Sequence, residues 1–229
     1  MKHKEFILTP ISSLIEKTLL SMDLYKGQVC NYIMKEYVLQ TLFLKLTGCM
    51  EQKAKCILWD IATHDFEFRR DFLTQITPKQ GEYSTYDSKN EVYKTLIKQV
   101  KMIGESKKKK LLNQLKEFKD NILEKSIAKE WFPRELRNLE IKELFTIKRW
   151  GQESLFNTPL NDKIYTSLYN HRNRCAHNVL SYQGNVMSPK RIKETGEYNY
   201  ASWFILLVLM DMIYMELYRR FIKNYSLSI

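Results

Sequence analysis

Prolines and glycines, the residues that most often end regular structure, are few in this chain and lie far apart. Among 229 residues there are five prolines and seven glycines, and residues 28–76 contain no proline and a single glycine, Gly48. A protein built from many short strands needs frequent turn residues, whereas long helices do not. The spacing therefore predicts an all-α protein with long helices.

Apolar residues at three- and four-residue steps divide the chain into expected helices. Pro10 opens a first helix over residues 10–24. Residues 33–46 indicate a second helix, and residues 50–61 either continue it or form another, depending on whether Gly48 interrupts them. Further helices are expected at 91–103, 106–127, 135–149, 159–180 and 199–224. We expect residues 1–229 to form a single domain, with the polar loop 77–90 as the candidate subdomain boundary.

The positive charge is concentrated in the second part of the chain. Residues 1–90 hold 12 basic and 11 acidic side chains, and residues 91–229 hold 25 and 15. A basic excess favours polyanions, among which nucleic acid is the commonest, although acidic proteins and anionic lipids also qualify. The run Lys107, Lys108, Lys109 and Lys110 predicts either a solvated helix face or a face that contacts RNA phosphates.

The cysteines and the N-terminus indicate a cytoplasmic protein with reduced thiols. Four cysteines include no C-x-x-C pair, and no histidine has metal-ligand spacing with them, so no metal or other cofactor is expected. A charged start followed by a short apolar stretch is not typical of a secretory signal.

One apolar run, residues 201–215, is long enough to raise the question of a membrane. A bilayer span needs about 20 apolar residues, and this run has 15 positions with Asp211 inside it. The pattern predicts a core helix near the C-terminus, with an interfacial or anchoring helix as the alternative.

Residues 170–178 (NHRNRCAHN) have the composition of a reaction site. Arg172 or Arg174 can hold a phosphate and stays charged, while His177, with an ordinary pKa near 6.5, can give or take a proton. Cleavage of RNA by its own 2′-hydroxyl needs a cation at the phosphate and groups that transfer protons, and it needs no metal. The alternative is a polar helix surface on which His177 is only hydrogen-bonded.

On an ideal helix, the side chains of Arg172 and His177 do not point toward the same phosphate. On an ideal helix Asn173 and His177 lie about 40° apart, whereas Arg172 and His177 lie about 140° apart. Either the helix is distorted, or the Arg172 side chain curls round it, or two copies of the segment face each other across a two-fold axis and form one composite site.

The segment Arg172-Asn173-Arg174-Cys175-Ala176-His177 resembles the R-N-x-x-x-H signature of the HEPN (higher eukaryotes and prokaryotes nucleotide-binding) superfamily. The resemblance implies a helical bundle with the motif on a late helix, a homodimer, and metal-independent endoribonuclease activity. By the same resemblance, His177 is the acid or base, Arg172 binds and stabilises the phosphate, and Asn173 orients His177 or the phosphate. Members of this kind act as toxins or as abortive-infection effectors against phage.

The resemblance assigns no role to two residues of the segment, and at one further position the sequence differs from the family pattern. Arg174 and His171 have no transferable role, and we expect RNA contacts from them. Toxins controlled by nucleotidylation carry a tyrosine two positions after the histidine, where this chain has Val179, and Tyr182 is out of register. The expected partners are RNA, a second copy, and an antitoxin or activating component, without a membrane. The alternative function is a non-catalytic HEPN-like module that binds RNA or a protein.

Overall fold

The computed structural model describes residues 3–23, 32–74, 83–125, 146, 148, 150–157, 160–177 and 200–226. Over these residues the fold is all-α, at 85% helix, and the only β-type pairing is an isolated antiparallel bridge between Trp150 and Phe156. The prediction of an all-α protein is therefore confirmed for the described part of the chain.

The helices follow the predicted order closely. In chain order they are α1 (His3–Leu8), α2 (Ser12–Asp23), α3 (Tyr32–His64), α4 (Phe66–Thr74), α5 (Tyr86–Val100), α6 (Glu105–Phe118), the π-helical turn η2 (Lys119–Leu123), the π-helical turn η4 (Asn161–Tyr165), α11 (Thr166–His177) and α13 (Tyr200–Ser226). Of the expected helix at 135–149, only residues 146 and 148 are among the described residues. Helix α1 was not predicted.

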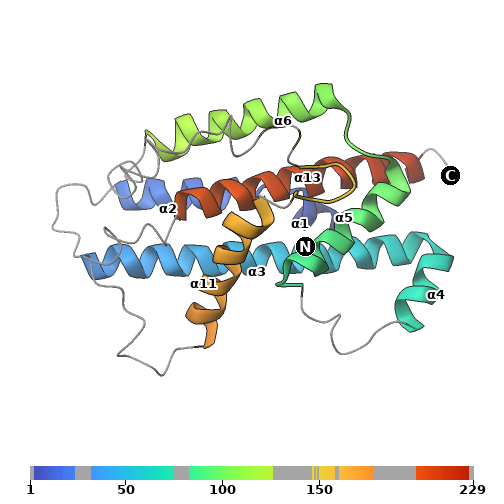
Figure 1. Cartoon of the computed structure of the whole chain (residues 1–229), viewed down its shortest axis with the longest axis horizontal. Coiled ribbons are helices and arrows are strands. Elements are labelled where there is room, and N and C mark those ends of the chain that lie inside the picture. Colours follow the sequence, from blue (N-terminus) through green and yellow to red (C-terminus); the bar gives the residue numbers. More distant parts are fainter. Residues whose placement is uncertain are drawn as a thin grey trace.

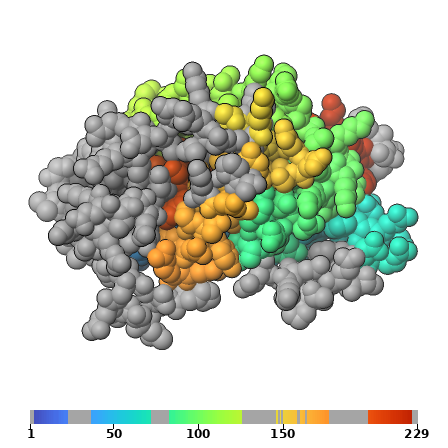
Figure 2. Space-filling model, in the orientation of Figure 1, coloured from blue at the N-terminus to red at the C-terminus, as the bar shows by residue number. Residues whose placement is uncertain are grey.

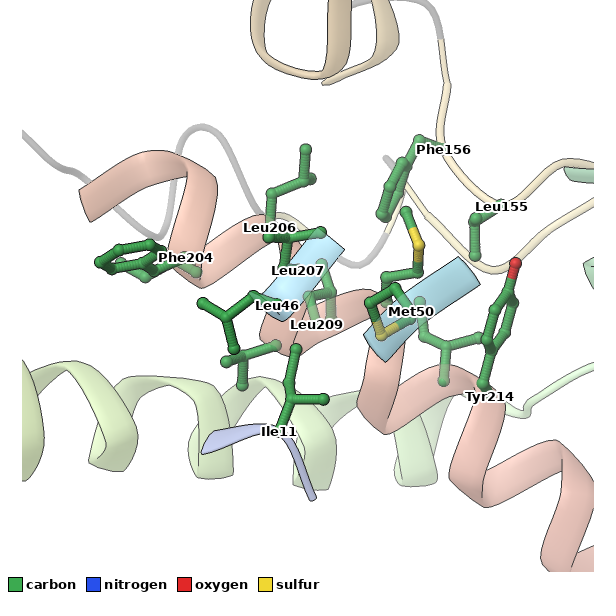
Figure 3. Packing of buried hydrophobic residues seen from close by; sticks show 14 of the residues in the cluster. Ile11, Leu46, Met50, Leu155, Phe156, Phe204, Leu206, Leu207, Leu209 and Tyr214 are labelled. Carbon is green, nitrogen blue, oxygen red and sulfur yellow. The ribbon is translucent and has the colours of Figure 1, made fainter. Parts of the chain in front are cut away.

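Helix α13 is the centre of the fold. Figure 1 shows α3 and α6 running along opposite sides of α13, and α5, η4 and α1 also contact it. Although α13 is long and apolar enough to cross a membrane, 94% of its apolar window is buried by the other helices. Figure 3 shows Leu207, Leu209 and Tyr214 of this helix packed among side chains from other segments. The apolar run is thus a core helix in this structure, as predicted.

Asp211, the one acidic residue in the apolar run, has a buried partner on α3. The Nζ atom of Lys53 lies 2.5 Å from Asp211 Oδ1, and the two side chains are 1% and 2% exposed. Asp211 Oδ2 also accepts a hydrogen bond of 2.9 Å from the backbone N–H of Ile11, and Lys53 donates to the carbonyl of Thr9. The two buried charges thus have the partners that they need. The same contacts connect the segment before α2 to α3 and α13.

Helix α3 runs through Gly48 without interruption. Its 33 residues form one helix, which answers the question that the sequence left open. A glycine inside a helix costs about 1 kcal/mol relative to alanine. Tertiary packing offsets this cost, because a buried stripe continues on both sides of Gly48. The stripe consists of Leu39, Leu42, Phe43, Leu46, Met50, Ala54, Ile57, Leu58 and Ile61.

The expected loop 77–90 ends earlier than predicted. Helix α5 already begins at Tyr86, because the Thr85 side chain accepts a hydrogen bond from the backbone N–H of Ser88 and so caps the helix. The prediction missed this cap and was wrong for residues 86–90, whereas 75–82 lie outside the described residues. Side chains of α5 join the same buried cluster as α3 and α13.

Candidate functional site around Arg172

The motif lies on α11, and one face of this helix packs into the protein. His171 and Arg172 lie three and four positions after Leu168, and Cys175 lies four and three positions after them, which places all four on the same side of a helix. Leu168 and His171 are buried, Arg172 and Cys175 are half-buried, and this face packs against α3. Figure 2 shows the other side of α11 at the molecular surface, next to the first turns of α5.

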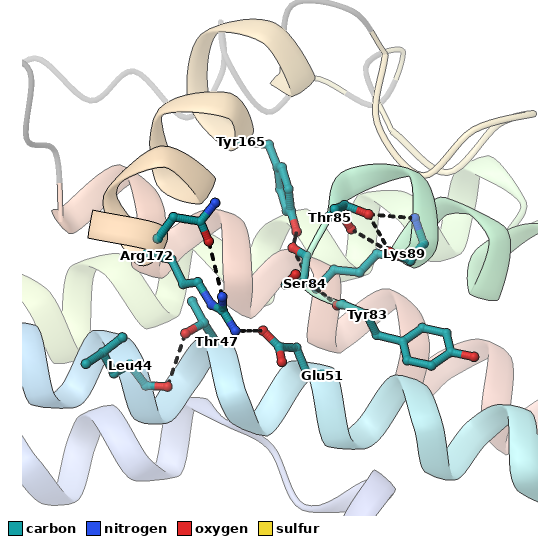
Figure 4. A network of polar contacts seen from close by, with 11 residues as sticks. Leu44, Thr47, Glu51, Tyr83, Ser84, Thr85, Lys89, Tyr165 and Arg172 are labelled. Atoms are coloured by element: carbon teal, nitrogen blue, oxygen red, sulfur yellow. Dashed lines mark hydrogen bonds and ion pairs between the residues drawn. The ribbon is translucent and has the colours of Figure 1, made fainter. Parts of the chain in front are cut away.

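Arg172 points toward α3 and is held at both ends of its guanidinium group. Nη2 lies 3.1 Å from Oε1 of Glu51, and Nη1 donates a 3.1 Å hydrogen bond to Oδ1 of Asn173 (Figure 4). The Arg172 and Glu51 side chains are 21% and 17% exposed, so the ion pair lies at the rim of the core. The guanidinium is therefore fixed in place while part of it still reaches solvent.

Sequence reasoning missed Glu51, although the helical pattern contains a signal for it. Glu51 lies four positions after Thr47 and three before Ala54, and both of these residues are buried. The periodicity of α3 therefore places a carboxylate on the face that packs into the protein. A charge on such a face requires a partner, and Arg172 is that partner.

A second polar layer lies beneath this ion pair. The buried ammonium of Lys89 donates to the carbonyls of Tyr83 and Ser84, and Tyr165 Oη donates a 2.7 Å hydrogen bond to the Ser84 carbonyl. Burial lowers the pKa of Lys89 to about 7, although the charge of Glu51 opposes this shift. Helix α5 is thereby bonded to η4, directly before the helix that carries Arg172.

His171 is a core residue in the structure. Its Nε2 atom lies 2.9 Å from Tyr200 Oη and 3.4 Å from Cys175 Sγ, and its ring stacks on Trp203 with centroids 4.9 Å apart. Burial, with a smaller contribution from the charge of Arg174, lowers the pKa of His171 to about 4. The expected RNA contact would need an exposed side chain, and His171 is only 4% exposed.

The other motif residues are placed less completely. Asn173 is half-buried and contacts Arg172, so in this structure it orients the arginine. Arg174 is exposed on the outer side of α11. His177 is the last residue of α11, and its side chain lies outside the described residues, as do Val179 and Tyr182.

The lysine run does not form one exposed surface with Arg172. Lys107 lies 2.9 Å from Glu216, and Lys108 is buried, with its Nζ atom donating to the carbonyl of Trp150 at 3.1 Å. Lys109 and Lys110 are exposed. Figure 1 shows α6 and the end of α11 on different sides of α13, so these lysines lie away from the motif.

Gly151 lies against the stem of the buried Lys108 side chain. This glycine has φ of +64°, and a Cβ atom there would lie 3.3 Å from Cε of Lys108. The turn therefore needs glycine both for its backbone conformation and for the space that the lysine stem fills.

Within the described residues, no three His, Cys, Asp or Glu side chains are grouped so as to hold a metal ion.

Comparisons with protein-family models, with curated proteins and with solved structures return no match. The assignment of function therefore depends on the signature at residues 172–177 and on the contacts that surround Arg172.

Proposed function

We propose that this chain has a HEPN-like bundle fold and is a metal-independent endoribonuclease that cleaves RNA through attack of the 2′-hydroxyl. Its cellular role in this proposal is that of a toxin or an anti-phage, abortive-infection effector in the cytoplasm. The observation that carries the proposal is the fixed guanidinium of Arg172, held by Glu51 and Asn173 at the edge of the core.

The contacts of Arg172 suit a phosphate-binding cation. A guanidinium group has five N–H donors, and the described contacts use Nη1 for Asn173 and Nη2 for Glu51. Donors that remain can bind the oxygens of a scissile phosphate, and the ion pair limits the freedom that the side chain loses on binding. A fixed cation stabilises the charge that develops on the phosphorane without having to reorganise.

The reaction that follows is an internal transesterification. A neutral imidazole of His177 takes the proton of the 2′-hydroxyl, and the 2′-oxygen forms a bond to phosphorus. The bond from phosphorus to the 5′-oxygen breaks, and a protonated imidazole gives its proton to that leaving group. The products are a 2′,3′-cyclic phosphate and a free 5′-hydroxyl.

A homodimer is the arrangement that we propose for bringing the groups together. Helix α11 is a regular α-helix from Thr166 to His177, so no distortion within it brings the histidine nearer to Arg172. Residues five positions apart lie about 140° apart around such a helix. Two facing copies of α11 would supply one histidine for each proton transfer and an arginine for the phosphate between them.

Cleavage of total RNA by the purified chain in EDTA tests the proposal. We expect cleavage by wild-type protein, products that end in 2′,3′-cyclic phosphate, and loss of activity in His177→Ala. Arg172→Ala should reduce the rate about 10²- to 10³-fold, the usual effect of removing a group that stabilises transition-state charge. Arg70→Ala, at an exposed arginine of α4, is the matched control and should cut at the wild-type rate. Equal cleavage by all variants, or a requirement for Mg²⁺, would refute the mechanism.

Glu51 gives a second, sharper comparison. Glu51→Gln keeps the shape of the side chain but removes the charge that holds Arg172, so we expect a reduction of about 10- to 100-fold through misplacement of the guanidinium. Far-UV circular dichroism should be unchanged, since a helix-forming residue replaces another on α3. A wild-type rate in this variant would mean that Glu51 does not position Arg172 for catalysis.

The ion pair also favours a second candidate, a non-catalytic HEPN-like module that binds RNA or a partner protein. An arginine that only joins α11 to α3 would make the same contact with Glu51. Overexpression distinguishes the two. If the wild type slows growth, and Arg172→Ala and His177→Ala relieve it at equal protein levels, the binding-only function is contradicted.

A further inference from the structure

A small cavity lies at the Arg172–Glu51 pair, which forms part of its lining. It is lined by residues of helices α3 and α13, of the first turn of α5 and the segment before it, and of η4 and α11. Its volume is about 10 Å³, measured as the space open to the centre of a water-sized sphere, which is room for about one water molecule. Its lining residues with polar side chains are Thr47, Glu51, Ser84, Lys89, Tyr165, Tyr169 and Arg172.

Ser84 provides an independent sign that the cavity takes a ligand. The residue is 5% exposed, and its Oγ atom is buried with no hydrogen-bond partner in the described part of the chain. Its carbonyl, by contrast, accepts from both Lys89 and Tyr165. A buried hydroxyl is rarely left unpaired, because it lost its hydrogen bonds to water when the chain folded.

The lining offers both donors and acceptors. The two described hydrogen bonds of Lys89 Nζ leave its third N–H hydrogen, and Tyr165 Oη donates its hydrogen and keeps lone pairs that can accept. Glu51 uses Oε1 for Arg172, which leaves Oε2 as an acceptor among the described contacts. A water molecule can donate to two groups and accept from two, so it matches this mixed lining better than an ion of either sign.

We propose that this cavity is a binding site for one structural water, which bridges Ser84 and Lys89 to the Arg172–Glu51 pair. Figure 4 shows Ser84 and Lys89 on the α5 side of the network and Glu51 and Arg172 on the other side. The water makes the two polar layers continuous, and it links the N-terminal turn of α5 to the motif arginine. The site does not depend on whether the protein cleaves RNA.

A high-resolution crystal structure of the full chain, with NMR of the same protein, tests the proposal. We expect one water peak within hydrogen-bond distance of Ser84 Oγ, and nuclear Overhauser contacts from a long-lived water to Ser84 and Lys89. Ser84→Val replaces the hydroxyl with methyl groups that fill the space, and it should remove both signals. It should also shift the side-chain N–H resonances of Arg172, whereas Ser106→Ala, at an exposed serine of α6, should change none of them.

The outcomes separate clearly. An empty cavity, an ion at the site, or a water that stays in Ser84→Val would overturn the proposal. Unchanged Arg172 resonances after loss of the water would overturn the bridge to the ion pair. If Ser84→Val does not fold, Ser84→Ala together with the wild-type measurements decides the matter, since the alanine variant should shorten the lifetime of the bound water.

Discussion

The buried pair of Lys53 and Asp211 permits a quantitative test of the fold. Lys53→Met keeps most of the apolar stem but leaves the carboxylate of Asp211 buried without its cation. Both side chains are at most 2% exposed, and removal of one partner from such a pair typically costs about 3–5 kcal/mol. For a chain of this size 1 kcal/mol shifts the Tm by about 2–4 °C. We therefore expect the Tm to fall by about 6–20 °C.

A double-mutant cycle separates the pair from its surroundings. Asp211→Leu leaves a buried ammonium and should cost a similar free energy. The double variant Lys53→Met with Asp211→Leu leaves no charge and should recover most of the roughly 3–5 kcal/mol that the worse single variant loses. Lys94→Met, which breaks the exposed pair with Glu91, is the control and should cost about 1 kcal/mol or less.

The pH dependence of Lys53→Met gives an independent check. Burial raises the pKa of Asp211 and the Lys53 charge opposes that rise, so loss of Lys53 raises this pKa further. Because the folded state then binds the proton more tightly than the unfolded state, the deficit is full only above the raised folded pKa and shrinks as the pH falls through it toward the unfolded pKa of about 3.9. Urea denaturation from pH 7 to pH 4 measures it. A deficit below about 1 kcal/mol, or a double variant less stable than both single variants, would refute the reasoning.

Three further outcomes follow from the site and its surroundings. Thr85→Ala removes the cap of α5 and should cost about 1 kcal/mol in urea denaturation, while Thr95→Ala, farther along the same helix, should cost less. NMR titration of the histidine ring protons should show that His171 stays neutral as the pH is lowered, until it takes up a proton near pH 4. A pKa near 6.5 for His171 would contradict its burial. Because burial lowers the pKa of Lys89 to about 7, the unfolded state binds more protons above that pH, and stability should rise from pH 7 toward pH 10. Lys89→Met should abolish this rise in Tm, and an unchanged rise would assign it to another group.

Much of the helical order could be predicted because helices leave a periodic signal. The steps of apolar residues located the helices now seen as α2, α5, α6 and α13 to within a few residues at most ends. The start of α5 was predicted late, since the hydrogen bond from Ser88 to Thr85 is a local contact in a segment that reads as polar loop. Periodicity also left Gly48 undecided, because the packing on both sides of it depends on the whole fold.

The contacts of the candidate site were harder to predict, because they join residues far apart in the chain. Arg172 was selected from its own segment, but Glu51 lies 121 positions before it, and only the fold brings the two together. His171 and Lys108 were assigned to RNA from their residue types. Their burial depends on Tyr200 and Trp203 in one case and on the loop at Trp150 in the other.

The contact between Asp211 and the backbone of Ile11 has a consequence for how the chain folds during synthesis. The two residues are 200 positions apart, and ribosomes add about 5–20 residues per second. The first helices therefore wait about 10–40 s for the carboxylate that accepts the hydrogen bond from Ile11, directly before α2. Over most of that time Arg172 and the helix that buries its surroundings do not yet exist. A nascent chain thus cannot contain an assembled site, and any activity begins only after α13 has been made.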